Sequence, residues 1–243
     1  MALDFNGTTQ HLLRASTPIT AVPFTLAGRY RYDTAIVEGA EHTILSIADH
    51  DAQQEFTLEI GRNGGVDYTI TMLNSGGTVD FALSTTPPVI NTWETAIGVY
   101  TANNSRTVYR NNASSGTGTA TITPSGLSHV YIGATSSSSS IIKPFNGALA
   151  DLAMWNVALD ASERAAYNAG VSPLLIRRSS LQLYVPGIRE VIDHRGGVFT
   201  NVNTATAFPH PRVYMPSSYY DLSVPSAVVA SKRRYTLTTL GVG

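Results

Sequence analysis

The chain of 243 residues contains no cysteine, and only 14% of its residues are charged. Disulfides, thiolate metal sites and cysteine nucleophiles are therefore excluded. The 16 basic and 17 acidic residues leave a net charge of −1, which gives no long-range field to attract nucleic acid or an anionic membrane. We expect neither nucleic acid nor a membrane among its partners.

Long apolar runs are also lacking. No stretch reaches the roughly 18 apolar residues that a membrane-spanning helix requires. The opening residues, Met1 to Gly7, have neither the basic region nor the apolar region of a signal peptide. We therefore expect a protein that is made in the cytoplasm of its host without a signal peptide.

Short alternating or β-branched segments are abundant between residues 24 and 133, and turns rich in Gly, Asn or Pro separate them. These segments are 24–27, 43–47, 55–60, 67–72, 78–83, 96–100, 107–110 and 129–133. Strands at this spacing, with no helices between them, are typical of an antiparallel sandwich or barrel. The serine-rich stretch 136–140 is predicted to be a loop.

One segment alone has the pattern of a helix. Asp160 is suited to the N-cap, and Glu163 completes a capping box three residues later. Residues 161–169 are rich in helix formers, Gly170 suits the position after a helix end, and Pro173 stops the helix. The sequence therefore predicts one short helix after a long series of strands.

The order of several motifs resembles laminin-G-like domains of the concanavalin A-like lectin/glucanase superfamily. The best match, Phe145 to Leu159, is similar to the family's "Phe-x-Gly-x-Ile-Asp-Asp-Val-x-Ile-Trp-x-x-Ala-Leu" and precedes the same short helix. Leu3 to Leu12 resembles the family's opening strand. Weaker similarities lie at 23–30, 91–100 and 106–112, so that the resemblance covers residues 1–186. It implies an all-β fold, a two-sheet antiparallel jelly-roll β-sandwich with one short helix.

The composition changes after residue 208, where prolines become frequent and tyrosines lie among them. Few regular strands tolerate this proline density. We predict a sandwich domain over 1–212 and an extended C-terminal arm over 213–243. Because such an arm buries little surface by itself, we expect it to lie on a partner. The expected partner-binding residues are Tyr214, Tyr219, Tyr220, Arg233 and Arg234.

Asp151 is the candidate metal ligand, and calcium is the candidate ion. The resemblance implies this, because many laminin-G-like and pentraxin-like sandwiches bind calcium at a sheet rim through an aspartate and backbone carbonyls. Hard oxygen ligands suit calcium. Ala150 stands where the first of the family's paired acids often lies. The alternative interpretation is a strand aspartate that faces solvent or caps a turn.

Asp49, Asp51 and Trp93 are the candidate ligand-binding residues. Asp49 and Asp51 flank His50 and precede Glu55, but Gln53 breaks the EF-hand pattern. A solvated hairpin turn is the favoured interpretation of this acidic stretch. Trp93 and Trp155 could each stack on a sugar, although packing in the core or at its rim is favoured for both.

No catalytic motif is found. The sequence has no His-Glu-x-x-His, no Gly-x-Ser-x-Gly and no phosphate loop, and it lacks the Glu-x-Asp-x-x-Glu strand of the laminarinase relatives.

The stretches 180–197 and 210–213 resemble those of laminin-G-like proteins encoded among tailed-phage structural genes. The leading hypothesis is a non-enzymatic virion protein, a capsid decoration or minor coat protein at the particle surface. Its partners would be other virion proteins and copies of itself. The alternative is a carbohydrate-binding module or adhesin for host glycans.

Overall fold

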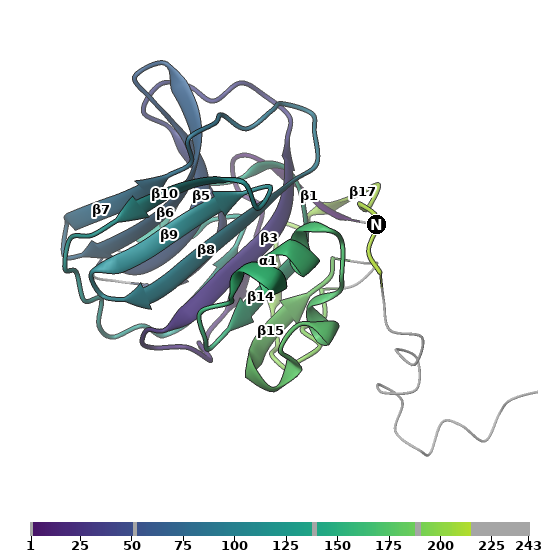
Figure 1. Cartoon of the computed structure of the whole chain (residues 1–243). Coiled ribbons are helices and arrows are strands. Elements are labelled where there is room, and N and C mark those ends of the chain that lie inside the picture. Colours follow the sequence, from purple (N-terminus) through teal and green to yellow (C-terminus); the bar gives the residue numbers. More distant parts are fainter. Residues whose placement is uncertain (1, 51–52, 138–139, 188–190, 215–243) are drawn as a thin grey trace, which may run out of the picture.

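The computed structural model describes residues 2–50, 53–137, 140–187 and 191–214 (Figure 1). They form two antiparallel sheets packed face to face, as the sequence predicts. The 8-stranded sheet A has the order β10-β9-β8-β3-β14-β1-β17, with β15 also paired to β14. The 7-stranded sheet B has the order β16-β2-β11-β4-β5-β6-β7, and β12 with β13 forms a separate pair.

The elements have the following bounds. Sheet A contains β1 Ala2–Asn6, β3 Phe24–Tyr32, β8 Glu94–Ala102, β9 Ser105–Arg110, β10 Ser114–Gly118, β14 Asn146–Trp155, β15 Leu181–Val185 and β17 Thr206–Phe208. Sheet B contains β2 His11–Arg14, β4 Glu41–Ala48, β5 Gln54–Asn63, β6 Val66–Ser75, β7 Thr78–Leu83, β11 His129–Ile132 and β16 Thr200–Val202. The remaining elements are β12 Thr135–Ser137, β13 Ser140–Ile142, the helix α1 Ala161–Asn168, and the short 3₁₀ helices η1 Pro173–Leu175 and η2 Arg178–Ser180.

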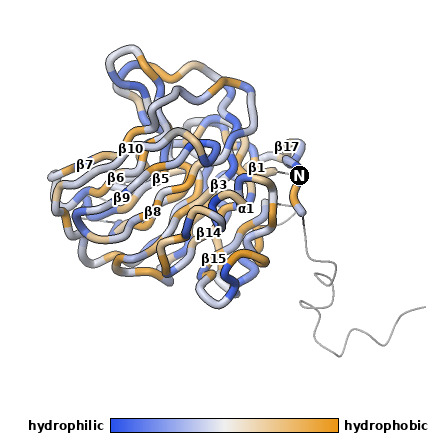
Figure 2. The backbone as a smooth tube through the Cα atoms, viewed as in Figure 1, coloured by the Kyte–Doolittle hydropathy of each residue, from blue (hydrophilic) through white to orange (hydrophobic). Residues whose placement is uncertain are grey.

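The main core lies between the sheets because successive strand side chains point to opposite faces. On β5 the apolar residues Phe56, Leu58 and Ile60 belong to this core. Apolar and polar residues alternate along many of the strands (Figure 2). The polar residues between those of β5, such as Glu55 and Glu59, therefore lie on the outer face of sheet B.

Helix α1 lies on the outer face of sheet A (Figure 1); it begins at Ala161, as the sequence predicts, and ends at Asn168, one residue before the predicted end. Asp160 accepts hydrogen bonds from the first turn, and Glu163 completes the capping box. A second apolar cluster joins the helix to the sheet, in which Trp155 packs edge-on against Tyr167 with ring centroids 6.2 Å apart. Trp155 is fully buried and donates to the Ile176 carbonyl over 2.8 Å, so the packing interpretation of this tryptophan is confirmed. No helix in the described part of the chain is long and apolar enough to cross a membrane.

A close approach of β10 to β7 joins the two sheets at one edge. A Cβ on Gly116 would lie 1.9 Å from the Leu83 carbonyl oxygen, and one on Gly118 would lie 2.7 Å from that of Phe81. Only glycine allows backbones to come this close. Arg106 of β9 forms an ion pair across the same seam with Asp80 of β7.

The β12–β13 pair covers part of the outer face of sheet B. The predicted loop over 136–140 is therefore wrong for its described residues, which continue as strands on either side of 138–139. Thr135 donates to Glu55 over 2.7 Å, and the neighbouring Lys143 lies 3.4 Å from Glu59. Because these contacts bury both carboxylates, the solvated-turn interpretation is also wrong for Glu55.

The C-terminal part of the described chain returns to the sandwich. Strand β16 pairs with β2 at the edge of sheet B, and β17 pairs with β1 at the edge of sheet A. Tyr214 extends this contact just past the expected boundary at Arg212, because its backbone bonds to Gly170 and Ser172 over 2.7 and 3.0 Å. The side chain of Tyr214 is exposed. The other predicted arm residues, Tyr219, Tyr220, Arg233 and Arg234, lie outside the described residues.

Candidate functional site

A pocket of about 140 Å³ lies on the outer face of sheet B, beside the covering β12–β13 pair. Strands β5, β6 and β7 form its floor, and the chain just before β4 forms one wall. Its lining residues are Gly39, Glu41, Arg62, Asn63, Ile70, Phe81 and Leu83. We refer to this set as the sheet B pocket. It combines a small apolar floor with charged and amide groups at the rim, which is the usual composition of a small-ligand site.

Phe81 provides an exposed aromatic surface in the sheet B pocket. Its side chain is 38% exposed, and Val79 on the same strand is 43% exposed. Both point to the outer face because they pair with Met72 and Asn74 in the β6–β7 register. Aromatic rings exposed in this way on a sheet offer a rigid, apolar contact surface to a ligand.

Gly61 creates room for the loop that forms the pocket wall. A Cβ at this position would lie 2.9 Å from the Ile70 side chain and 3.2 Å from the Ala40 carbonyl oxygen. The Gly39 N–H donates to the Arg62 carbonyl and the Arg62 N–H donates to the Ala40 carbonyl, both over 3.0 Å, which joins the loop to β5. The wall is therefore fixed to the sheet by backbone contacts and does not depend on side chains alone.

Arg62 is oriented by three partners. Its guanidinium donates to Asp67 over 2.8 Å and to the Gly65 carbonyl over 2.8 Å, and it lies 3.6 Å from Glu38. Glu38 in turn accepts hydrogen bonds from the backbone N–H groups of Gly64 and Gly65 over 2.6 and 2.9 Å. These contacts hold the β5–β6 turn and the loop before β4 together at one end of the sandwich (Figure 1).

Lys143 bridges two carboxylates at the inner end of the pocket. Its ammonium group lies 2.6 Å from Glu41 and 3.4 Å from Glu59. Burial raises the pKa of Glu59 to about 7, although Lys143 opposes this shift. Glu55 and Glu59 share the outer face of β5, and both are covered, so neither carboxylate is accessible to a substrate.

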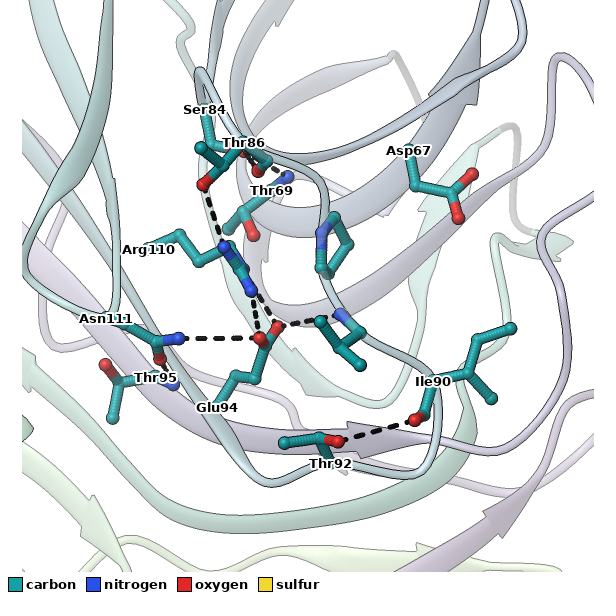
Figure 3. Close-up of polar contacts among 12 residues, drawn as sticks. Asp67, Thr69, Ser84, Thr86, Ile90, Thr92, Glu94, Thr95, Arg110 and Asn111 are labelled. Carbon is teal, nitrogen blue, oxygen red and sulfur yellow. Dashed lines mark hydrogen bonds and ion pairs between the residues drawn. The ribbon is translucent and has the colours of Figure 1, made fainter.

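A polar network fastens the loop between β7 and β8 at the same end of the sandwich. Figure 3 shows Arg110 lying between Thr86 of this loop and Glu94 at the start of β8. Arg110 donates to Thr86 over 2.8 Å and forms a bidentate ion pair with Glu94. Tyr30 also donates to Glu94, over 2.8 Å, and Asn111 lies within 3.4 Å. These groups are paired with one another, and the network stabilises the position of the loop.

The structure corrects the predicted position of Asp151. It does not lie at an exposed rim: it occupies a β-bulge in the middle of β14, with φ 51°, and is 1% exposed. Arg29 Nε lies 3.3 Å from its Oδ2, and Tyr184 donates to its Oδ1 over 3.0 Å. Burial raises the pKa of this carboxyl, against the opposing charges of His210 and Arg29. A cation already faces the carboxylate, so this environment does not favour calcium, and calcium binding stays a prediction.

The structure does not bring the other candidate ligand residues together with the sheet B pocket. Asp49 accepts a hydrogen bond from the Gln54 backbone over 3.3 Å and so closes the turn between β4 and β5. Asp51 lies outside the described residues. Trp93 packs against a floor of alanines on the outer face of sheet A, with its ring centroid 6.3 Å from that of Phe208. Its favoured interpretation, packing at the rim, agrees with this position.

The sequence interpretation missed Glu41, Arg62, Asn63 and Phe81. Val79 and Phe81 alternate with polar residues along the predicted strand, which indicates that one face is apolar but not that this face is open. In the sequence, Asn63 precedes two glycines and indicated only a turn between two strands. Among the described residues, no group of three or more His, Asp or Glu is placed to hold a metal ion. The lining of the sheet B pocket combines the exposed ring of Phe81 with the polar residues Glu41 and Asn63.

A family model described as "Concanavalin A-like lectin/glucanases superfamily" matches residues 6–163. Among curated proteins, no sequence matches the chain.

Solved structures share the fold at low sequence identity. The native heptameric SAP-like pentraxin of Limulus polyphemus is 17% identical with a TM-score of 0.57, over 84% of this chain and 94% of that chain. The CBM40 module of the Ruminococcus gnavus IT-sialidase, bound to α2,3-sialyllactose, is 16% identical with a TM-score of 0.55, over 69% of this chain and 95% of the module. Tailspike protein 2 of an Escherichia coli O157:H7 bacteriophage is 13% identical with a TM-score of 0.57, over 79% of this chain and 27% of the tailspike.

Proposed function

We propose, from the premise that this chain belongs to the concanavalin A-like lectin/glucanases superfamily, that it is a non-catalytic carbohydrate-binding protein. The observation on which the proposal rests is the sheet B pocket, whose lining includes the exposed aromatic residue Phe81 and the polar residues Glu41 and Asn63. A sugar has apolar C–H faces and hydroxyl edges, so it can stack on the ring while its hydroxyls bond to the rim.

The contacts that cover or pair the buried glutamates support the proposal of a binding protein without catalysis. Glycoside hydrolysis requires two carboxyl groups that reach the glycosidic bond from either side. Glu55 and Glu59 are the pair that shares a strand face, and Thr135 and Lys143 cover them. Glu94 accepts hydrogen bonds from Arg110 and Tyr30.

Replacement of Phe81 by alanine is expected to weaken glycan binding by about tenfold or more, because truncation of a central aromatic contact commonly has this effect. A glycan array would first identify the ligand, in calcium and in chelator, and titration calorimetry would then compare the variants. Val79→Ala is the matched control, since it removes an exposed apolar side chain from the same strand outside the pocket lining. Equal affinities for wild type and Phe81→Ala would place the ligand elsewhere.

The second candidate function is a structural protein at the surface of a viral particle, where the sandwich would bind host glycans. It is supported by the fold similarity to a phage tailspike and by the proline- and tyrosine-rich sequence beyond residue 208. In this proposal the C-terminal residues contact other virion proteins and copies of the same chain.

Removal of residues 215–243 is expected to convert an oligomer into a monomer with unchanged thermal stability, because the removed tyrosines would contact neighbouring copies. The truncation is placed after Tyr214, whose backbone hydrogen bonds to Gly170 and Ser172 would otherwise be lost. Size-exclusion chromatography with light scattering measures the mass of both forms. A full-length chain that is already monomeric would contradict self-assembly through this segment.

A further inference from the structure

Three loops at one end of the sandwich present apolar side chains to solvent (Figure 1). They are the loop before β4, the β5–β6 turn and the loop between β7 and β8. The exposed apolar residues, which we refer to as the loop-end patch, are Val37 (73% exposed), Val66 (39%), Val89 (51%) and Ile90 (37%). Apolar side chains that gather on a surface in this way mark an interaction site, whereas single ones need no explanation.

Hydrogen bonds hold the three loops together beneath the loop-end patch. The hydroxyl of Tyr32, the last residue of β3, donates to the Pro88 carbonyl over 3.1 Å and lies 3.4 Å from Asp67. Glu38, which follows Val37, accepts hydrogen bonds from two successive N–H groups of the β5–β6 turn over 2.6 and 2.9 Å. The patch is therefore fixed before a partner arrives, so that binding orders few of its residues.

The charged residues at this end of the sandwich leave one negative charge in excess. Three carboxylates, those of Asp33, Glu38 and Asp67, are paired with two guanidinium groups, those of Arg31 and Arg62. The Glu38 side chain is 55% exposed, so a further cation can approach its carboxylate from solvent. The loop-end patch therefore suits a partner that is both apolar and basic.

The sequence beyond Tyr214 has this composition. Its basic run, Lys232 to Arg234, is flanked on both sides by apolar residues, namely Val228, Val229, Tyr235 and Leu237. This segment contains three basic residues and one acidic residue, a charge of +2, whereas residues 1–214 contain 13 basic and 16 acidic residues, a charge of −3. Lys232 lies 18 residues after Tyr214, and an extended chain of that length spans about 60 Å, enough to reach a neighbouring molecule.

We propose that the loop-end patch is the docking site for residues 228–237 of a second copy of this chain. The inference rests on the proposed self-assembly through the C-terminal segment and names the surface that receives it. The apolar residues of the segment would cover the loop-end patch, and its basic run would pair with the excess carboxylate. Because the segment and its site lie at different places on the chain, the contact is head to tail, and the copies would form a ring or an open chain.

Cross-linking between single cysteines tests the docking site, because the chain contains no cysteine of its own. Full-length Val37→Cys and Tyr235→Cys chains with tags of different mass are mixed, oxidised and separated on a non-reducing gel. A disulfide forms only between cysteines that come close together. We expect the two variants to link in at least about tenfold higher yield than a control mixture of Val198→Cys with Tyr235→Cys. Val198 is the matched control because it is a valine that is 83% exposed in the segment before β16, outside the loop-end patch.

Light scattering on the wild-type chain separates failure of the docking site from failure of self-assembly. A wild type that is monomeric at every concentration overturns both. A wild-type oligomer with equal cross-linking of Val37→Cys and Val198→Cys, or with no cross-link to either, overturns the docking site and leaves self-assembly intact. A chain with both Val37→Cys and Tyr235→Cys that forms its disulfide within one molecule overturns the assignment to a second copy.

Discussion

Replacement of Glu94 by glutamine is expected to lower the free energy of unfolding by about 3–5 kcal/mol, the usual cost of removing one partner from a buried ion pair. Glu94 is 4% exposed and accepts from both Tyr30 and Arg110. Glutamine keeps the size of the side chain but leaves the Arg110 cation without its bidentate partner. Urea denaturation followed by tryptophan fluorescence measures the loss.

A double-mutant cycle with Arg110→Met distinguishes the ion pair from general packing. If the pair itself accounts for the loss, Glu94→Gln combined with Arg110→Met should be less destabilised than the sum of the single variants, because no charge is left unpaired. Strict additivity would show that Glu94 and Arg110 act separately. The loop between β7 and β8 should loosen in either single variant, since Arg110 also donates to Thr86 over 2.8 Å (Figure 3).

Local sequence signals predicted the elements that depend on neighbouring residues. The capping pair Asp160 and Glu163 located helix α1 because both hydrogen bonds form within one turn. The family motif over Phe145 to Leu159 contains strand β14, which lies inside sheet A between β3 and β1. The two-sheet arrangement followed from alternating strands and their turns.

The candidate site depends on contacts between segments that are distant in the sequence. The alternation of apolar and polar residues along a strand does not predict such contacts. Glu38 meets Gly64 and Gly65 across the sandwich end, and Lys143 meets Glu59 from a different layer. The same reason explains the error at Asp151: its motif position suggested an exposed rim, but a bulge turns it toward Arg29 and Tyr184. The sequence interpretation placed Asp151 at an exposed position because its partners, Arg29 and Tyr184, lie far from it in the sequence.

Replacement of Gly116 by alanine is expected to lower the free energy of unfolding by about 3 kcal/mol or more. The new Cβ would lie 1.9 Å from the Leu83 carbonyl oxygen and 3.2 Å from its nitrogen. Because backbone atoms cannot rotate away as a side chain does, β10 and β7 must separate. Since β7 also contains Phe81, the variant should lose glycan affinity together with stability.

Gly126→Ala is the control for this last prediction. Gly126 has φ 68° and nothing within 4 Å of a Cβ, so alanine there costs only about 1 kcal/mol of backbone strain. A large difference in urea midpoint between the two variants would show that the seam, and not the loss of glycine as such, determines stability. Similar midpoints would mean that β10 can move away from β7 at little cost. In that case the edge of the sandwich beside the sheet B pocket is adjustable, and Phe81 is not held on a rigid strand.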